Sequence, residues 1–132
     1  MKPVKDISID IAQKKIFAGH PIHGVISINY SGRYDTIVIN SQIENSNDIF
    51  NYTSLNGKKI NYTYARLSIF RSEIADDRKS LDFTAITKHI PTGDSSNAKF
   101  RVAIIQEHKE IASDVDHIKI AKQISSGESN QI

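Results

Sequence analysis

The sequence predicts an all-β domain, an antiparallel two-sheet sandwich of roughly seven to nine strands. Apolar side chains recur at every second position in several short segments, so each segment has one dry face and one wet face. Clusters of Gly, Pro, Asn and Ser separate these segments. Isoleucine is the commonest apolar residue and leucine is rare, which suits a pleated, half-buried surface better than a helix.

The order of the strands follows from this alternation. In the first segment, Ile7, Ile9 and Ile11 alternate with polar residues. Asn56-Gly57 is the strongest hairpin signal, because a type I′ turn needs two residues that tolerate positive φ. After this turn the apolar residues change near Ala65 from even-numbered to odd-numbered positions. This change of phase predicts a bulge or a bend in one long strand. The predicted strands are 6–11, 22–30, 36–44, 50–53, 59–69, 81–85, 100–104, 110–112 and 117–122, with a loop at 91–97.

The segment 106–124 has two interpretations. Its apolar residues recur at near-helical spacing, but Ile118 and Ile120 also fit a strand. We favour strands, because every earlier element is β. The predicted organisation is one sandwich domain over 1–124 and a polar tail at 125–132 that we expect to be disordered.

Composition narrows the function classes. The chain has 132 residues, no cysteine and a formal net charge of +2, so cysteine-based metal sites are excluded and a dedicated nucleic-acid binder is disfavoured. No stretch has the length of a membrane span, and the first residues lack the apolar run of a signal peptide, which predicts a cytoplasmic protein. No cofactor-binding motif is present, and we expect no cofactor.

The run Phe17–Ile28 carries a resemblance. Phe17, Gly19, Ile22, Gly24 and Val25 fall where the N-terminal sandwich of the arrestin family has an aromatic residue, glycines and apolar residues. The sequence therefore resembles an arrestin-like, immunoglobulin-like domain, although His20 stands where the family usually has an acid. The resemblance implies a scaffold or adaptor. Independently of the family, Gly19 suits a positive φ, and Gly24 suits a close approach of a neighbouring ring or backbone.

Aromatic residues suggest a binding surface. If Tyr52, Tyr62 and Tyr64 share an exposed face, they form a platform that, with Phe70, is suited to a protein partner. The same tyrosines beside the basic pair at 58–59 and Arg66 would also suit single-stranded nucleic acid. The plainer alternative places these aromatic residues in the core.

His20 and His23 suggest a metal or small-ligand site, since two imidazoles in an H-x-x-H pattern can approach one ion. The plainer reading is ordinary surface histidines. Asp114 and Asp116, with the pair at 76–77, offer hard oxygen ligands that would suit calcium, or they are solvated loop residues.

Catalytic motifs are missing from the sequence, which has no G-x-S-x-G, P-loop or HExxH pattern, so we predict a non-enzyme. The leading hypothesis is a non-catalytic protein-interaction domain that uses a sheet face or an edge strand, and edge pairing also makes a homodimer a reasonable expectation. The alternatives are a metal- or small-ligand-binding module and a single-stranded nucleic-acid binder.

Overall fold

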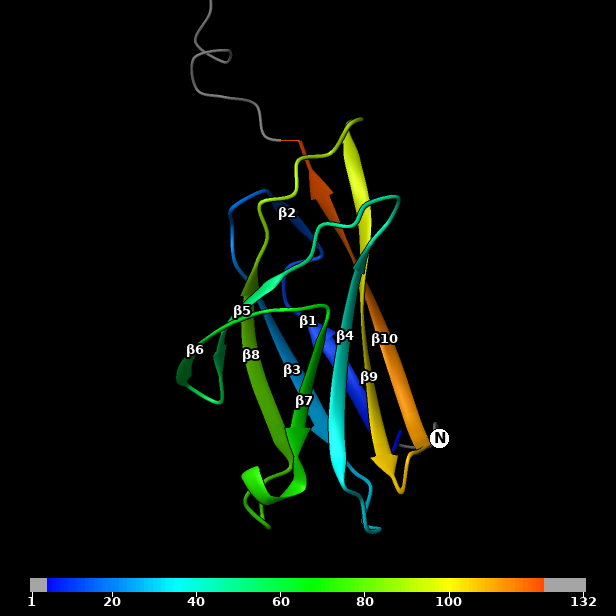
Figure 1. Cartoon of the computed structure of the whole chain (residues 1–132). Helices are drawn as coiled ribbons and strands as arrows, with labels where there is room; N and C mark the ends of the chain where they lie inside the picture. The colour runs from blue at the N-terminus through cyan, green and yellow to red at the C-terminus, as the bar shows by residue number, and fades with distance from the viewer. Residues whose placement is uncertain (1–4, 123–132) are drawn as a thin grey trace, which may run out of the picture.

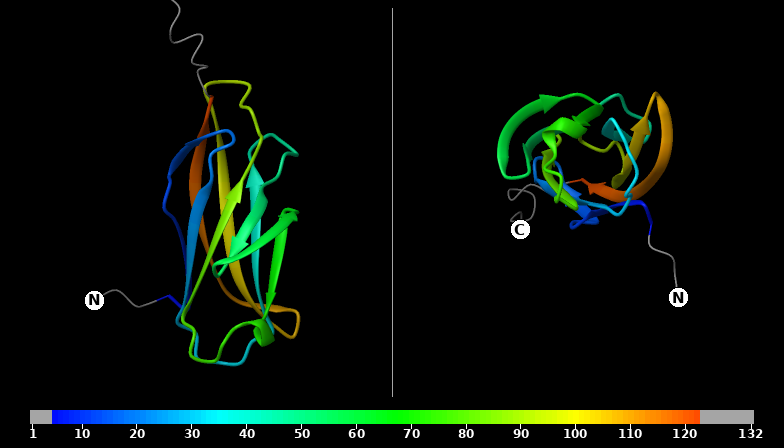
Figure 2. Two further views of the ribbon diagram at one scale, coloured as in Figure 1. Left: turned by 90° about the vertical axis from the view of Figure 1, so that its left-hand side faces the viewer. Right: turned by 90° about the horizontal axis from the view of Figure 1, so that it is seen from below.

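A computed structural model describes residues 5–122 as two packed five-stranded sheets (Figure 1). One sheet has the order β1-β3-β8-β5-β6 and the other has the order β2-β10-β9-β4-β7. Seen along the strands, the two sheets wrap around a common interior (Figure 2). The strands are β1 (Ile7–Ile11), β2 (Lys15–Phe17), β3 (Ile22–Ile28), β4 (Thr36–Ile43), β5 (Asn51–Leu55), β6 (Lys58–Thr63), β7 (Arg66–Phe70), β8 (Ser80–Ile86), β9 (Ser95–Gln106) and β10 (Lys109–Ala121).

The all-β sandwich predicted from the alternation is confirmed. In β3, buried and less buried residues alternate along the whole strand, as the pattern of isoleucines requires. The described residues form ten strands, more than the predicted number, partly because the short strand β2 pairs in parallel with β10. All the other strand pairs are antiparallel.

The core is made of isoleucine side chains around an aromatic cluster. Phe100 packs against Phe50 with ring centroids 4.8 Å apart and against Phe83 at 5.9 Å. These rings are fully buried. Because Phe83 lies on β8 and Phe100 on β9, one strand from each sheet, and Phe50 lies just before β5, this cluster joins the two layers of the sandwich.

Both glycine predictions in the arrestin-like run hold in the structure. Gly19 has a φ of +84° in the connection between β2 and β3. A Cβ on Gly24 would lie 2.4 Å from Cζ of Phe83 and 2.9 Å from Cδ1 of Ile11. Gly24 therefore lets a core ring cross β3 at close range.

The prediction of a bulge or a bend in one long strand near Ala65 was wrong in one respect: the chain bends at Tyr64 and Ala65, but the bend lies between two separate strands. The phase slip marks a change of sheet: β6 pairs with β5 in one sheet, and β7 pairs with β4 in the other. Ala65 lies at the crossing, where its carbonyl oxygen accepts a 2.8 Å hydrogen bond from the amide of Ser41. A strand that changes sheet must present its opposite face to the core, so it produces the same change of phase as a bulge.

Two boundaries also differ from the prediction. The segment 106–124 contains a strand and not a helix where it is described, as favoured, but after a turn at Glu107 and His108, β10 runs unbroken from Lys109 to Ala121 where two short strands were predicted. β9 begins at Ser95, inside the predicted loop. The predicted tail at 125–132 lies outside the described residues. No helix in residues 5–122 is long and apolar enough to cross a membrane.

Candidate functional site

The structure divides the predicted aromatic platform. Tyr52 is fully buried, and its ring packs edge-on against Phe83 with centroids 5.7 Å apart. Burial raises the pKa of the Tyr52 phenol to about 12. Tyr52 is therefore a core residue and contributes nothing to an exposed face, because β5 is an inner strand whose Tyr52 side chain points between the sheets.

Tyr62 and Tyr64 do come together. Their ring centroids are 4.8 Å apart at a 50° angle. Tyr62 is half-buried against the core, whereas the side chain of Tyr64 is 63% exposed. Phe70 is also exposed, but it lies at the other end of β7, roughly 13 Å of extended strand from Arg66. The two tyrosines form one aromatic pair, and Phe70 belongs to a separate part of the surface.

The tyrosine pair lies on a side of the sandwich where both sheets end. β6 has β5 as its only strand neighbour within residues 5–122, and β7 has only β4, so each strand presents one unpaired edge. Figure 2 shows the two strands next to each other on this side. We call this side, formed by residues 58–70, the open edge. It exposes Lys58, Lys59 and Arg66, and residues 58–70 include no acidic side chain.

On the opposite side, β1 and the short strand β2 are also edge strands, and two outward amides of β1 are occupied. Asp114 on β10 accepts a 2.9 Å hydrogen bond from the amide of Ile9, and Asp116 accepts a 2.7 Å hydrogen bond from the amide of Ile11. In an antiparallel pair, alternate amides point away from the partner strand, and here the two carboxylates take them. We call these contacts the aspartate clasp.

Two lysines complete the aspartate clasp. The ammonium of Lys5 lies 2.8 Å from Asp114, and the ammonium of Lys14 contacts Asp116. Burial is the largest single influence on both carboxyl groups and acts to raise their pKa, but the hydrogen bonds from Lys5 or Lys14 and from backbone amides together outweigh it. The pKa of each aspartate is therefore lowered. Asp114 and Asp116, two of the four aspartates weighed for calcium, therefore join the sheets. Of the other two, Asp76 lies 3.1 Å from the guanidinium of Arg71.

The predicted metal histidines do not form a cluster. His20 is exposed and packs edge-on against the ring of Phe17 at 5.9 Å. His23 lies 3.5 Å from Asp82 across the β3–β8 pair. Over residues 5–122, no group of three or more His, Cys, Asp or Glu side chains is placed to hold a metal ion. A zinc site needs at least three protein ligands, so His20 and His23 alone do not form one.

A buried histidine that the sequence did not indicate lies at one end of the sandwich. His89, in the connection between β8 and β9, is 7% exposed. Its Nδ1 lies 2.8 Å from Oδ2 of Asp48, and its Nε2 lies 2.8 Å from Oγ of Ser96. The hydrogen bond with His89 is the main cause of the lowered pKa of Asp48. No local spacing relates residues 48, 89 and 96, so only the fold identifies them as a group.

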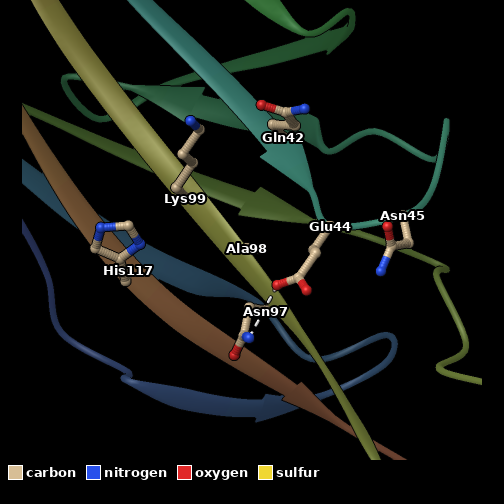
Figure 3. A pocket seen from close by; sticks show the side chains of 7 residues that line it. All are labelled: Gln42, Glu44, Asn45, Asn97, Ala98, Lys99 and His117. Atoms are coloured by element: carbon tan, nitrogen blue, oxygen red, sulfur yellow. Dashed lines mark hydrogen bonds between the residues drawn. The ribbon is translucent and has the colours of Figure 1, made fainter. Parts of the chain in front are cut away.

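A shallow groove lies on the outer face of the second sheet (Figure 3). Gln42, Lys99 and His117 are neighbours across β4, β9 and β10 and form one row. Asn97 donates a 2.9 Å hydrogen bond to Glu44 at the end of the groove. The lining is polar and carries both signs of charge, so the groove has no single ligand preference.

Comparisons with known proteins identify the fold. No protein-family model and no curated protein matches the sequence. Several solved structures match the fold. The adhesin CfaE of enterotoxigenic E. coli superposes with a TM-score of 0.57 at 12% identity, over 91% of this chain and 49% of that one. The reeler domain of human F-spondin gives a TM-score of 0.56 at 10% identity, over 89% and 93% of the two chains.

A type II cohesin domain from the cellulosome of Acetivibrio cellulolyticus gives a TM-score of 0.50 at 10% identity, over 89% of this chain and 95% of that one. The sequence identities are too low to transfer a function from these proteins to this chain, whereas the superpositions establish the architecture. The chain therefore shares the β-sandwich fold of adhesin, reeler and cohesin domains.

Proposed function

We propose that the domain is a protein-interaction module that binds an extended, acidic segment of a partner protein at the open edge. The observation that carries this proposal is the asymmetry of the two sides of the sandwich. The aspartate clasp occupies outward amides of β1, whereas β6 and β7 keep unpaired edges beside Tyr62 and Tyr64. An unpaired edge is a template for strand addition.

The charge of the open edge selects the kind of segment. Lys58, Lys59 and Arg66 are exposed, and residues 58–70 carry no Asp or Glu. A second copy of this chain would bring the same positive charges into contact, so this edge favours an acidic partner over self-pairing. Tyr64, a large and exposed ring, supplies the apolar contact area that interfaces commonly use.

The arrestin-like resemblance supports an adaptor role for this module, and it rests on the run Phe17–Ile28. The cohesin, reeler and adhesin domains share the fold, and the word adhesin itself describes a binding protein. The nucleic-acid alternative is weakened because one of its three stacking tyrosines, Tyr52, is buried.

Selection from a displayed library of random peptides tests the proposal. The expected peptides are acidic, and their binding weakens with added salt. A Tyr64→Ala variant and a Lys58→Glu/Lys59→Glu variant should each reduce the affinity of a selected peptide by about tenfold or more, because ΔΔG values above about 1.4 kcal/mol are usual for central interface residues. Fluorescence anisotropy measures this change.

Lys99→Glu is the matched control, since Lys99 is exposed on β9, on the outer face of the sheet and away from the open edge. The proposal is wrong if selected peptides bind the open-edge variants as tightly as the original chain. It is also wrong if the open edge binds single-stranded oligonucleotides in preference to acidic peptides, or if sedimentation shows a dimer whose stability changes in Lys58→Glu/Lys59→Glu but not in Lys99→Glu, since that dimer would form through the open edge.

A further inference from the structure

Ser96, His89 and Asp48 have the geometry of a nucleophile, a base and an orienting carboxylate. Ser96 Oγ lies 2.8 Å from Nε2 of His89, and Asp48 Oδ2 lies 2.8 Å from Nδ1. These are hydrogen-bond distances on both ring nitrogens, in the order that links an acid, an imidazole and a hydroxyl. None of Asp48, His89 and Ser96 belongs to the open edge.

The hydrogen bonds fix the tautomer of the neutral imidazole. Asp48 is a carboxylate and accepts only, so Nδ1 of His89 donates to it. Nε2 is then the acceptor, and the hydroxyl of Ser96 donates its proton to Nε2. In this arrangement His89 can take the proton of Ser96 when Oγ attacks an electrophile.

The surrounding backbone holds this geometry. Oγ of Ser46 accepts a 2.9 Å hydrogen bond from the amide of Asp48, and Oγ1 of Thr87 accepts a 3.1 Å hydrogen bond from the amide of His89. The hydroxyl of Thr87 donates in turn to the carbonyl of Ile49. The base and the carboxylate therefore lie on two loops that are tied to each other.

Ser96 is accessible from a small pocket of about 280 Å³ at this end of the sandwich. The side chain of Ser96 is half-buried, and the pocket is lined mainly by polar residues. Ser95 lines the same pocket but is exposed and makes no hydrogen bond with His89. The volume suits a short acyl group better than a large apolar ligand.

We infer that Ser96 is an activated nucleophile that accepts an acyl group from small esters with good leaving groups. Oγ of Ser96 forms a bond to the carbonyl carbon, its proton passes to Nε2 of His89, and the leaving alkoxide departs and takes that proton. Water then attacks the acyl-serine with His89 as base, which releases the acid and restores the hydroxyl. The net reaction is ester plus water giving acid plus alcohol.

Labelling of the full chain with a fluorophosphonate probe tests this inference. Oγ of Ser96 displaces fluoride from phosphorus, and mass spectrometry of the digested protein locates the adduct. We expect Ser96 to react on the order of 100-fold faster than Ser95, which is the usual size of general-base assistance. With 4-nitrophenyl acetate as substrate, the burst of 4-nitrophenol should likewise come from Ser96 rather than from Ser95.

Variants separate activation from a purely structural role. Ser96→Ala should abolish the adduct, whereas Ser95→Ala, the matched control, should leave it unchanged. Asp48→Asn should slow labelling even where thermal unfolding is unchanged, because the amide no longer fixes the tautomer, and Asp48→Glu should restore part of the rate.

The inference is overturned if Ser96 reacts no faster than Ser95 in the original chain, whatever the stability of the variants. In that case the hydrogen bonds of His89 serve only to hold two loops. Loss of peptide binding at the open edge would leave this result untouched, because no residue is shared between the two sites.

Discussion

Gly24 is a residue whose role is purely steric. Phe83 Cζ would lie 2.4 Å from a Cβ at this position, and Phe83 is fully buried. The nearest approach is to a core side chain, so any larger residue must displace the aromatic cluster.

We therefore expect Gly24→Ala to lower the free energy of unfolding by about 1–3 kcal/mol, the usual cost of overpacking a core. Urea unfolding followed by fluorescence measures the change. Gly93→Ala is the control, because a Cβ there meets no atom within 4 Å. A Gly24→Ala protein as stable as the original would show that Phe83 can move.

Asp116 carries a pH dependence that can be assigned a sign. Its pKa in the folded chain is lowered, because hydrogen bonds from the Ile11 amide and Lys14 outweigh the opposing effect of burial. A lowered pKa means that Asp116 stabilises the fold above its ordinary pKa of about 3.9 and that this stabilisation is lost as the pH falls through the lower folded value.

We expect Asp116→Ala to lower the free energy of unfolding by about 1–3 kcal/mol at pH 7, since the Ile11 amide loses its acceptor. The difference from the original chain should shrink between pH 4 and pH 2, measured by urea unfolding at each pH. Asp10→Ala is the control, because Asp10 contacts the same Lys14 but is largely exposed. A difference independent of pH would contradict this account.

At the scale of elements, the two hairpin turns show what sequence can and cannot indicate. Asn56 and Gly57 have positive φ values of 53° and 80°, as their residue types predicted. The turn between β9 and β10 has the same backbone form at Glu107 and His108, with φ values of 50° and 66°. Neither residue is a usual choice there, so the continuous β9–β10 hairpin could not be read from the chain.

The second turn gives a stability prediction. His108→Gly should raise the free energy of unfolding by about 1 kcal/mol or less. Glycine removes the steric strain that the histidine side chain causes at a positive φ, and this gain is only slightly larger than the extra backbone entropy that glycine loses on folding. Thermal unfolding measures the gain. Asn56→Gly is the contrasting case, in which no gain is expected: asparagine already tolerates this conformation, and Oδ1 of Asn56 accepts a 3.0 Å hydrogen bond from the amide of Asp82. A loss of stability in His108→Gly would mean that the side chain makes a contact worth more than the strain.

At the scale of the whole molecule, local alternation predicted the fold class because each strand records which of its faces is buried. It did not record which sheet a strand joins, so the crossing at Ala65 was predicted as a bulge or a bend in one long strand, and both an exposed and a buried Tyr52 were left open. The group Asp48, His89 and Ser96 was invisible for a related reason: its members meet only through the packing of two loops and a strand.

The pairing of β2 with β10 brings residues 15–17 beside residues 119–121. The clasp on β1 likewise depends on Asp114 and Asp116. During synthesis, a nascent chain that has emerged only as far as β9 can pair β1 with β3, but it lacks the partner strand of β2 and the two carboxylates that hold the outward edge of β1. Such long-range closure slows folding, and β2 and the outward edge of β1 would remain available to chaperones or to aggregation until β10 leaves the ribosome.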